Sequence, residues 1–156
     1  MISQFDLGLA CKDVEWLRSI WKGPILIKGI QTVEDALIAV DSGVEAIAIS
    51  NHAGRQLDVA PTPFDLLPEV AEAVQDRLEI ICDGGARRGS DIVKAVSLGA
   101  TAVMAGRPYL YALAACGERG VDHVLDLLHE GVERTMSLTG AASVDDLTKE
   151  LISRTE

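Results

Sequence analysis

The segment Ala39–Ile47 recurs 56 residues later as Ala95–Val103, with the same order of helical and apolar residues. The same elements surround both copies: a short apolar strand pattern, a polar loop, an amphipathic helix pattern that ends at glycine, and a second strand pattern. In this register the loop after Lys28 corresponds to the loop after Asp83. The chain therefore contains two similar strand–helix–strand–helix units.

Alternating strands and helices predict a parallel sheet with right-handed crossovers. Repeated pieces of this kind are typical of the (β/α)₈ TIM barrel, and four strands make about half of one. We therefore predict a single α/β domain over residues 1–156 that is half a barrel followed by helices. An open four-stranded doubly wound sheet is the alternative. The expected strands are 25–27, 46–49, 78–82 and 101–104, and the expected helices are 12–20, 32–43, 62–74, 90–98, 109–116, 121–138 and 144–153.

Composition narrows the class of partner. A chain of 156 residues with 48% hydrophobic and 24% charged residues can form a soluble domain with a substantial core. The net charge of −10 argues against nucleic acid or an anionic membrane as a partner.

No apolar run approaches the roughly 18 residues that a spanning helix needs, and no signal peptide is evident, so a cytoplasmic location is expected. Cys11, Cys82 and Cys116 are interpreted as reduced core residues without a metal or disulfide role.

Polar or glycine-containing segments follow each of the expected strands. Because the carboxyl ends of parallel strands share one face of a sheet, these four segments are expected to meet at one rim. A long polar loop at the end of a buried strand is also where α/β proteins place their chemistry. The four segments are Lys28-Gly29, Ser50–Asp58, Asp83–Gly89 and Gly106-Arg107.

The last two of these segments look like a phosphate site. Gly84-Gly85 allows the backbone to approach an anion closely, and Arg87 or Arg88 can add charge-assisted hydrogen bonds. Gly106-Arg107 supplies a further amide and guanidinium just before a helix, whose dipole favours negative charge. The alternative is a tight glycine turn with solvated arginines.

Lys28 ends a buried strand, where a positive charge implies either an ionic partner or a functional role. An ammonium there can stabilise the negative charge that a flavin gains on reduction, bind a sugar phosphate, or form a Schiff base. A structural salt bridge to a neighbouring carboxylate is the remaining interpretation.

His52 and Arg55 are the most informative pair in the chain. Histidine titrates near neutral pH and can take a proton from an alcohol or an activated C–H group. Arginine can bind a carboxylate with two parallel hydrogen bonds. The pair predicts a catalytic base beside a carboxylate-binding group. His123 and His129 lie among acidic residues in the late helical region and are expected to be solvated.

The segment Ser50–Asp58 resembles the active-site signature of the FMN-dependent α-hydroxy acid dehydrogenases and oxidases, a family that includes glycolate oxidase, L-lactate dehydrogenase and mandelate dehydrogenase. Lys28-Gly29, Asp83–Gly89 and Gly106–Pro108 match further motifs of this family in the same order, and Leu138–Gly140 fits as well. The resemblance covers nearly the whole chain. It implies strands five to eight of a TIM barrel that binds FMN and oxidises an L-2-hydroxy acid, of the lactate or glycolate type, to a 2-oxo acid.

The resemblance also implies a role for each matching residue. His52 would be the catalytic base and would contact the substrate, and Arg55 would bind the substrate carboxylate. Lys28 would lie at the N1–O2 edge of the flavin, and Ser50 would also contact the cofactor. The flavin phosphate and ribityl chain would be held by Asp83, Gly84, Gly85, Ala86, Arg87, Gly106 and Arg107.

The chain departs from the family pattern in two ways. Ala53 stands where the family usually has glycine after the histidine, which matters if that position needs a positive φ. The chain is also less than half as long as a family member, so we expect that it forms a homo-oligomer, pairs with a complementing amino-terminal half, or is a fragment of a longer gene product. Two other functions stay open: a non-catalytic half barrel that binds FMN or phosphate, and another phosphate-binding TIM barrel such as an inosine-monophosphate-dehydrogenase-like enzyme.

Overall fold

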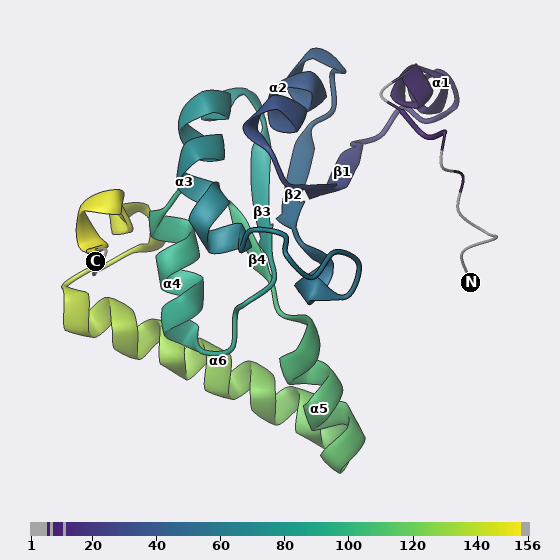
Figure 1. Ribbon diagram of the computed structural model, residues 1–156. Coiled ribbons are helices and arrows are strands. Elements are labelled where there is room, and N and C mark those ends of the chain that lie inside the picture. Colours follow the sequence, from purple (N-terminus) through teal and green to yellow (C-terminus); the bar gives the residue numbers. More distant parts are fainter. Residues whose placement is uncertain (1–5, 7, 11, 154–156) are drawn as a thin grey trace.

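The computed structural model describes residues 6, 8–10 and 12–153. Short 3₁₀ turns lie at His52–Gly54, Gln75–Arg77, Val144–Asp146 and Lys149–Leu151. The helices and strands, labelled in Figure 1, are α1 (Lys12–Ile20), β1 (Leu26–Ile30), α2 (Val33–Asp41), β2 (Ala46–Ser50), α3 (Pro63–Val74), β3 (Glu79–Asp83), α4 (Gly89–Ser97), β4 (Ala102–Met104), α5 (Gly106–Cys116) and α6 (Glu118–Thr139).

The strands form one parallel sheet in the order β1-β2-β3-β4. The register places Ser50 opposite Asp83 and Asp83 opposite Met104, so the last residues of three strands lie level with one another. A bulge between Lys28 and Ile30 shifts the pairing of β1 with β2. The predicted parallel α/β sheet is therefore confirmed, with each strand next to its neighbour in sequence.

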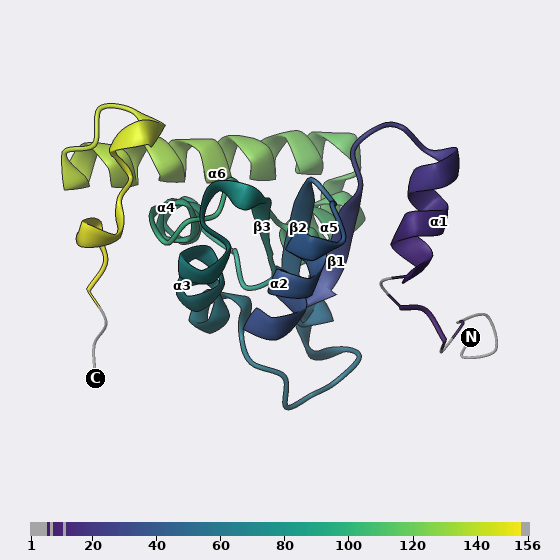
Figure 2. The ribbon, with the colours of Figure 1, turned by 90° about the horizontal axis from the view of Figure 1, so that it is seen from above.

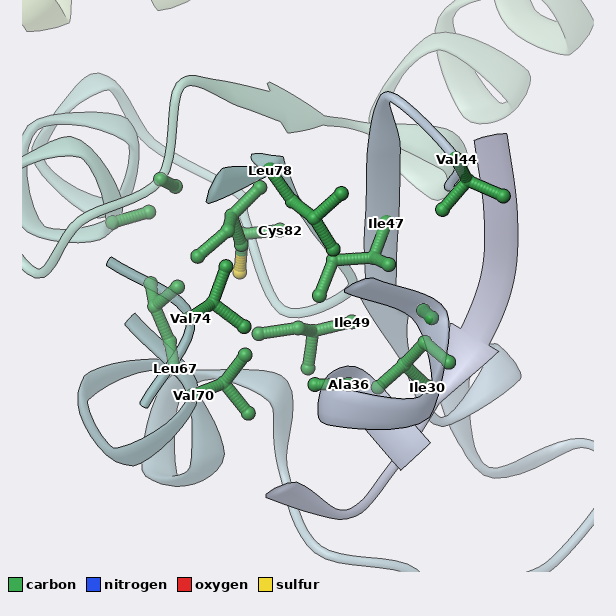
Figure 3. Close-up of a cluster of buried hydrophobic side chains, with 14 of the residues drawn as sticks. Ile30, Ala36, Val44, Ile47, Ile49, Leu67, Val70, Val74, Leu78 and Cys82 are labelled. Atoms are coloured by element: carbon green, nitrogen blue, oxygen red, sulfur yellow. The ribbon is translucent and has the colours of Figure 1, made fainter. Parts of the chain in front are cut away.

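The core lies between one face of the sheet and helices α2, α3 and α4, which follow the outside of the sheet in Figure 2. Alternate residues of β2, Ile47 and Ile49, point at α3 and are essentially inaccessible to solvent. Complete burial of such a side chain contributes about 1.5–3 kcal/mol. Figure 3 shows Leu67, Val70 and Val74 of α3 packed against these strand residues.

Among the described residues, part of the opposite face of the sheet is exposed to solvent. Ile27 and Val103 pack on the core cluster, so the period-two alternation of a strand turns Leu26 and Met104 to the other side. These two side chains are 41% and 44% exposed. A doubly wound sheet would carry helices on both faces, and the arrangement seen here is instead half of a (β/α)₈ barrel, with the barrel interior uncovered.

The internal repeat is visible in the backbone. Helix α4 begins and ends 56 positions after α2, and the residues before the two helices have nearly identical conformations: φ −137°, ψ 157° at Thr32 and φ −135°, ψ 158° at Arg88. The glycines behind the two helices, Gly43 and Gly99, both have positive φ. The repeat in the sequence therefore corresponds to a repeated structural unit.

Several predicted helix boundaries are wrong, including the start of α6, which is Glu118 rather than residue 121. The expected helix over 144–153 is instead the 3₁₀ turns Val144–Asp146 and Lys149–Leu151, separated by an extended segment in which Leu147 is buried. Helix α4 begins at Gly89, one residue before the expected cap Ser90, because Asp91 accepts hydrogen bonds from the amides ahead of the helix. Helix α5 begins at Gly106 rather than at 109, because proline is tolerated in a first helical turn.

The cysteines are only partly as predicted. Cys82 is fully buried in the core, where burial, with a further contribution from the Asp83 charge, raises its pKa to about 11. Cys116 is exposed at the end of α5, so its interpretation as a core residue is wrong. Cys11 lies outside the described residues. In the described part of the chain, no helix is both long and apolar enough to cross a membrane.

Candidate active site

A cavity of about 370 Å³ opens at the carboxyl ends of the four strands. The loop after β2 and the start of α5 lie at this end of the sheet (Figure 1). The structure therefore brings the predicted site residues together at one rim, apart from Ser50, which is fully buried and does not line the cavity. The predicted residues that line it are Lys28, His52, Arg55, Asp83, Gly84, Gly85, Ala86, Arg87, Gly106 and Arg107.

Ser50 instead joins two charged residues of neighbouring strands. Its hydroxyl donates to Asp83 Oδ2 at 2.6 Å and accepts from Lys28 Nζ at 3.1 Å. It also accepts the backbone N–H of His52 at 3.1 Å. A hydroxyl has one donor and two acceptor positions, so Ser50 is fully used. Strand register explains the contact with Asp83, because Ser50 and Asp83 are direct neighbours across β2 and β3.

Lys28 and Asp83 form a salt bridge of 2.5 Å, so the salt-bridge interpretation of Lys28 is confirmed in the geometry. The Asp83 side chain is only 19% exposed. Its burial raises the pKa of Asp83, but the hydrogen bonds from Lys28 and Ser50 and the positive charges of Lys28 and His52 outweigh this effect and leave the pKa below its ordinary value. Asp83 is therefore a fixed negative charge beside the imidazole of His52.

The loop that carries His52 has an unusual backbone. His52 and Ala53 have φ values of 52° and 58°, in the left-handed region that costs non-glycine residues about 1–2 kcal/mol each. Side-chain hydrogen bonds hold this conformation: Asn51 Oδ1 accepts from the Ala53 N–H at 2.9 Å, and Arg107 Nη2 donates to the Ala53 carbonyl at 2.6 Å. Arg107, predicted as a cofactor ligand, therefore contacts the His52 loop.

Gly29 lies next to the imidazole ring of His52. Its φ is +100°, and a Cβ atom placed on it would lie 3.0 Å from Cε1 of the imidazole. Gly29 also sits at the bulge between Lys28 and Ile30. Glycine therefore allows the end of β1 to contact the edge of the imidazole ring directly.

Replacing Ala53 with glycine is expected to stabilise the protein by about 0.5–1 kcal/mol, because glycine adopts the positive φ without strain. The Ala53 side chain is exposed, so little packing is lost. Urea unfolding measures the difference. Ala114→Gly, at an exposed position inside α5, is the matched control and should destabilise by up to about 1 kcal/mol. A destabilised Ala53→Gly variant would show that the φ of Ala53 is not a source of strain.

The predicted phosphate loop has the backbone that close approach of an anion requires. Gly84 and Gly85 have φ values of 119° and 87°. The first turn of α5 is open, because nothing lies within 4 Å of a Cβ placed on Gly106. The amides of Arg87 and Arg88, by contrast, are both bound to Asp91 Oδ2 at 3.0 Å. Any anion here would depend on the glycine segment, the start of α5 and arginine side chains.

Sequence reasoning missed several residues of the cavity. Asn51 follows a strand end directly, so its position alone could have identified it. Thr62 and Pro63 were interpreted only as the start of a helix, and Met104, Pro108 and Leu110 carry no chemical signal in the sequence. His123 and His129 are exposed on α6, away from the cavity, as expected.

Comparison with known proteins places this geometry in one family. The family model described as FMN-dependent dehydrogenase matches residues 1–154. A peroxisomal (S)-2-hydroxyacid oxidase of Arabidopsis thaliana is 53% identical over 154 residues, which are 99% of this chain and 42% of that protein. A pre-mycofactocin synthase of Mycobacterium tuberculosis is 53% identical over 137 residues, 88% of this chain and 35% of that protein. An L-lactate dehydrogenase of Alcaligenes faecalis is 46% identical over 152 residues, 97% of this chain and 40% of that protein.

Solved structures show the same similarity. A flavocytochrome b2 variant with pyruvate bound has a TM-score of 0.92 and 41% identity, over 94% of this chain and 38% of that one. A mandelate oxidase with (S)-2-phenylpropionate has a TM-score of 0.86 and 45% identity, over 89% of this chain and 42% of that one. The chain spans about 40% of the length of the relatives it matches. The family model covers almost all of the chain, and the chain therefore belongs to the FMN-dependent dehydrogenase family.

Proposed function

We propose that this chain supplies the cofactor-binding and base-bearing half of an enzyme that oxidises an L-2-hydroxy acid, of the lactate or glycolate type, to the 2-oxo acid. One observation carries the proposal: a histidine, an arginine and two glycine-containing strand ends line a single cavity at the rim of the half barrel. The names of relatives such as the 2-hydroxyacid oxidase and the lactate dehydrogenase support the same reaction class.

The residues of the cavity fit FMN. The glycine segment Gly84–Ala86 and the open first turn of α5 at Gly106 provide backbone that an anion can approach, and Arg87 and Arg107 supply the positive charge for the phosphate. Lys28 would lie at the flavin edge that gains negative charge. Ser50, being buried, would act through Lys28 rather than by direct contact.

In the proposed reaction, His52 takes the proton of the substrate and Arg55 binds the substrate carboxylate. Bound FMN would accept the two electrons together with the second hydrogen, as a hydride or its equivalent. Asp83 would place a negative charge near the imidazole when His52 takes this proton. The hydrogen bond from the His52 N–H to Ser50 and the contact with Gly29 keep the imidazole at the cavity.

A second candidate is a half barrel that binds FMN without turnover. The pairing of Lys28 with Asp83 favours it, because this ammonium is already neutralised by a carboxylate. The equal identity to a pre-mycofactocin synthase also leaves a different substrate open within the family. The family match argues against an inosine-monophosphate-dehydrogenase-like enzyme.

Absorbance spectroscopy of the purified chain, mixed with FMN, tests the proposal. The expected result is a bound flavin spectrum that is bleached anaerobically by L-lactate or glycolate, and bleaching that is lost in His52→Ala. His129→Ala, an exposed histidine on α6, is the control and should bleach normally. Bound flavin that is never bleached would support the binding module, and absence of flavin binding would overturn both candidates.

We also propose that a second four-stranded unit covers the open face of the sheet, either another copy of this chain or the amino-terminal half of a related barrel. The exposure of Leu26 and Met104 on that face supports this, as do the outer edges of β1 and β4, with which no further strand pairs among the described residues. Sedimentation velocity at micromolar concentration should show a dimer, or a complex when the other half is added. A stable monomer under both conditions would contradict it.

The proposed location is the cytoplasm.

A further inference from the structure

Arg107 connects two parts of the cavity that are far apart in the sequence. Its Nη2 donates to the carbonyl of Ala53 at 2.6 Å, although the two residues are 54 positions apart. Arg107 is the second residue of α5, at the end of β4, whereas Ala53 follows His52 in the loop after β2. Both residues line the cavity.

The hydrogen bond holds a strained piece of backbone. The positive φ values of His52 and Ala53 are unfavourable for residues with a Cβ atom, so this segment would relax if nothing held it. Ser50 and Asn51 bind the N–H groups of His52 and Ala53, which fixes the amino side of the segment. Arg107 donates to the Ala53 carbonyl and so fixes the carboxyl end of the segment.

A guanidinium has five N–H donors in one plane. In the described part of the chain, the Arg107 side chain makes one hydrogen bond, to the Ala53 carbonyl. Its remaining donors can therefore bind an oxyanion at the cavity while Nη2 stays on the loop. An anion held in this way would restrict the rotation of the Arg107 side chain and strengthen the bond to Ala53.

We propose that Arg107 is a positioning residue that couples the phosphate site to the His52 loop. An oxyanion bound at the glycine segment Gly84–Ala86 and the start of α5 fixes the Arg107 guanidinium, and the guanidinium fixes the loop that carries His52 and Arg55. The coupling to the anion rests on the proposed function, whereas the hold on the loop does not. Arg107 acts here through the backbone of Ala53 and not as a base.

Trypsin cleavage reports on this loop directly. Arg55 is exposed and is followed by Gln56, so cleavage after Arg55 measures how often the loop opens. Arg107 precedes Pro108, so replacing it removes no trypsin site. In the absence of ligand, Arg107→Met should be cut after Arg55 roughly ten-fold faster than the natural protein, the effect expected of losing one charge-assisted hydrogen bond. Mass spectrometry follows the peptide, and cleavage after Lys94 in α4 is the internal reference for folding.

Arg87→Met is the matched control, because Arg87 is also an exposed arginine of the cavity but no side-chain hydrogen bond to the loop is recorded for it. It should be cut after Arg55 at the natural rate. Equal ligand-free rates in Arg107→Met and the natural protein would overturn the proposal, as would equal acceleration in both variants.

The coupling is tested by adding inorganic phosphate or FMN, with the occupancy of either ligand measured by calorimetric titration. Either ligand should slow cleavage of the natural protein several-fold and leave saturated Arg107→Met unprotected. Protection of Arg107→Met at full occupancy would overturn the coupling. If the natural protein binds neither ligand, the proposed function fails instead, and the ligand-free comparison of the two variants still decides the hold on the loop.

Discussion

Replacing Gly89 with alanine is expected to lower the free energy of unfolding by about 3 kcal/mol or more, the upper range for an overpacked site. A Cβ atom on Gly89 would lie 2.1 Å from the backbone nitrogen of Val132 and 2.2 Å from the carbonyl carbon of Gly131. Both are backbone atoms of α6, so no side chain can rotate away. The two helices would have to separate, and α6 would lose its packing on α4. Thermal unfolding should show a melting temperature lower by roughly 10 °C.

Gly106→Ala is the matched control, because Gly106 is also the first residue of a helix and has nothing within 4 Å of its Cβ position. Helix propensity alone favours alanine over glycine at both positions by up to about 1 kcal/mol. The two variants should therefore change stability in opposite directions, with Gly106→Ala neutral or slightly stabilising. A stable Gly89→Ala protein would mean that α6 can move on α4 without cost.

The sequence was sufficient to predict the sheet, because the alternation of strands and helices and the internal repeat depend on local patterns. The 56-residue offset between α2 and α4 follows directly from that repeat, although the predicted bounds of the two helices differ from the observed ones. The contact of Gly89 with α6 could not be predicted, because it joins segments more than 40 residues apart and glycine carries no pattern of its own. The turns after Ser143 were missed for a similar reason: the burial of Leu147 outweighs a local helix signal.

The candidate site, too, could be predicted only in part from the sequence. Parallel strands explain why Lys28, His52 and Asp83 meet at one rim, and this grouping was predicted. The hydrogen-bond partners of these side chains depend on strand register and on side-chain length and conformation. The hydrogen bonds of Ser50 with both Lys28 and Asp83 were therefore not predicted. The contact of Arg107 with the loop was also missed, because charge alone had indicated an anion as its partner. The positions of lysine and arginine at the strand ends predict a basic cavity, whereas geometry decides what each basic group contacts.

Asp83→Asn is expected to lower the free energy of unfolding at pH 7 by about 1–2 kcal/mol. The substitution keeps the shape of the side chain but removes the charge that pairs with Lys28. A fully buried pair broken in this way would cost about 3–5 kcal/mol, but the Lys28 side chain is 36% exposed, and water reduces the effect. Urea unfolding measures it, and Asp76→Asn, at an exposed position after α3, is the charge-matched control that should change little.

The pH dependence separates this charge effect from a packing effect. Because the folded-state pKa of Asp83 lies below its ordinary value of 3.8, the carboxylate contributes stability above that value and loses it as the pH falls through the folded pKa. The difference between the natural protein and Asp83→Asn should therefore be constant from pH 7 to about pH 5 and shrink toward pH 3. In the Asp83→Asn background, Lys28→Met should cost less than it does alone, because the partner charge is already absent. An Asp83→Asn effect that persists unchanged at pH 3 would assign it to the hydrogen bond with Ser50 rather than to the ion pair.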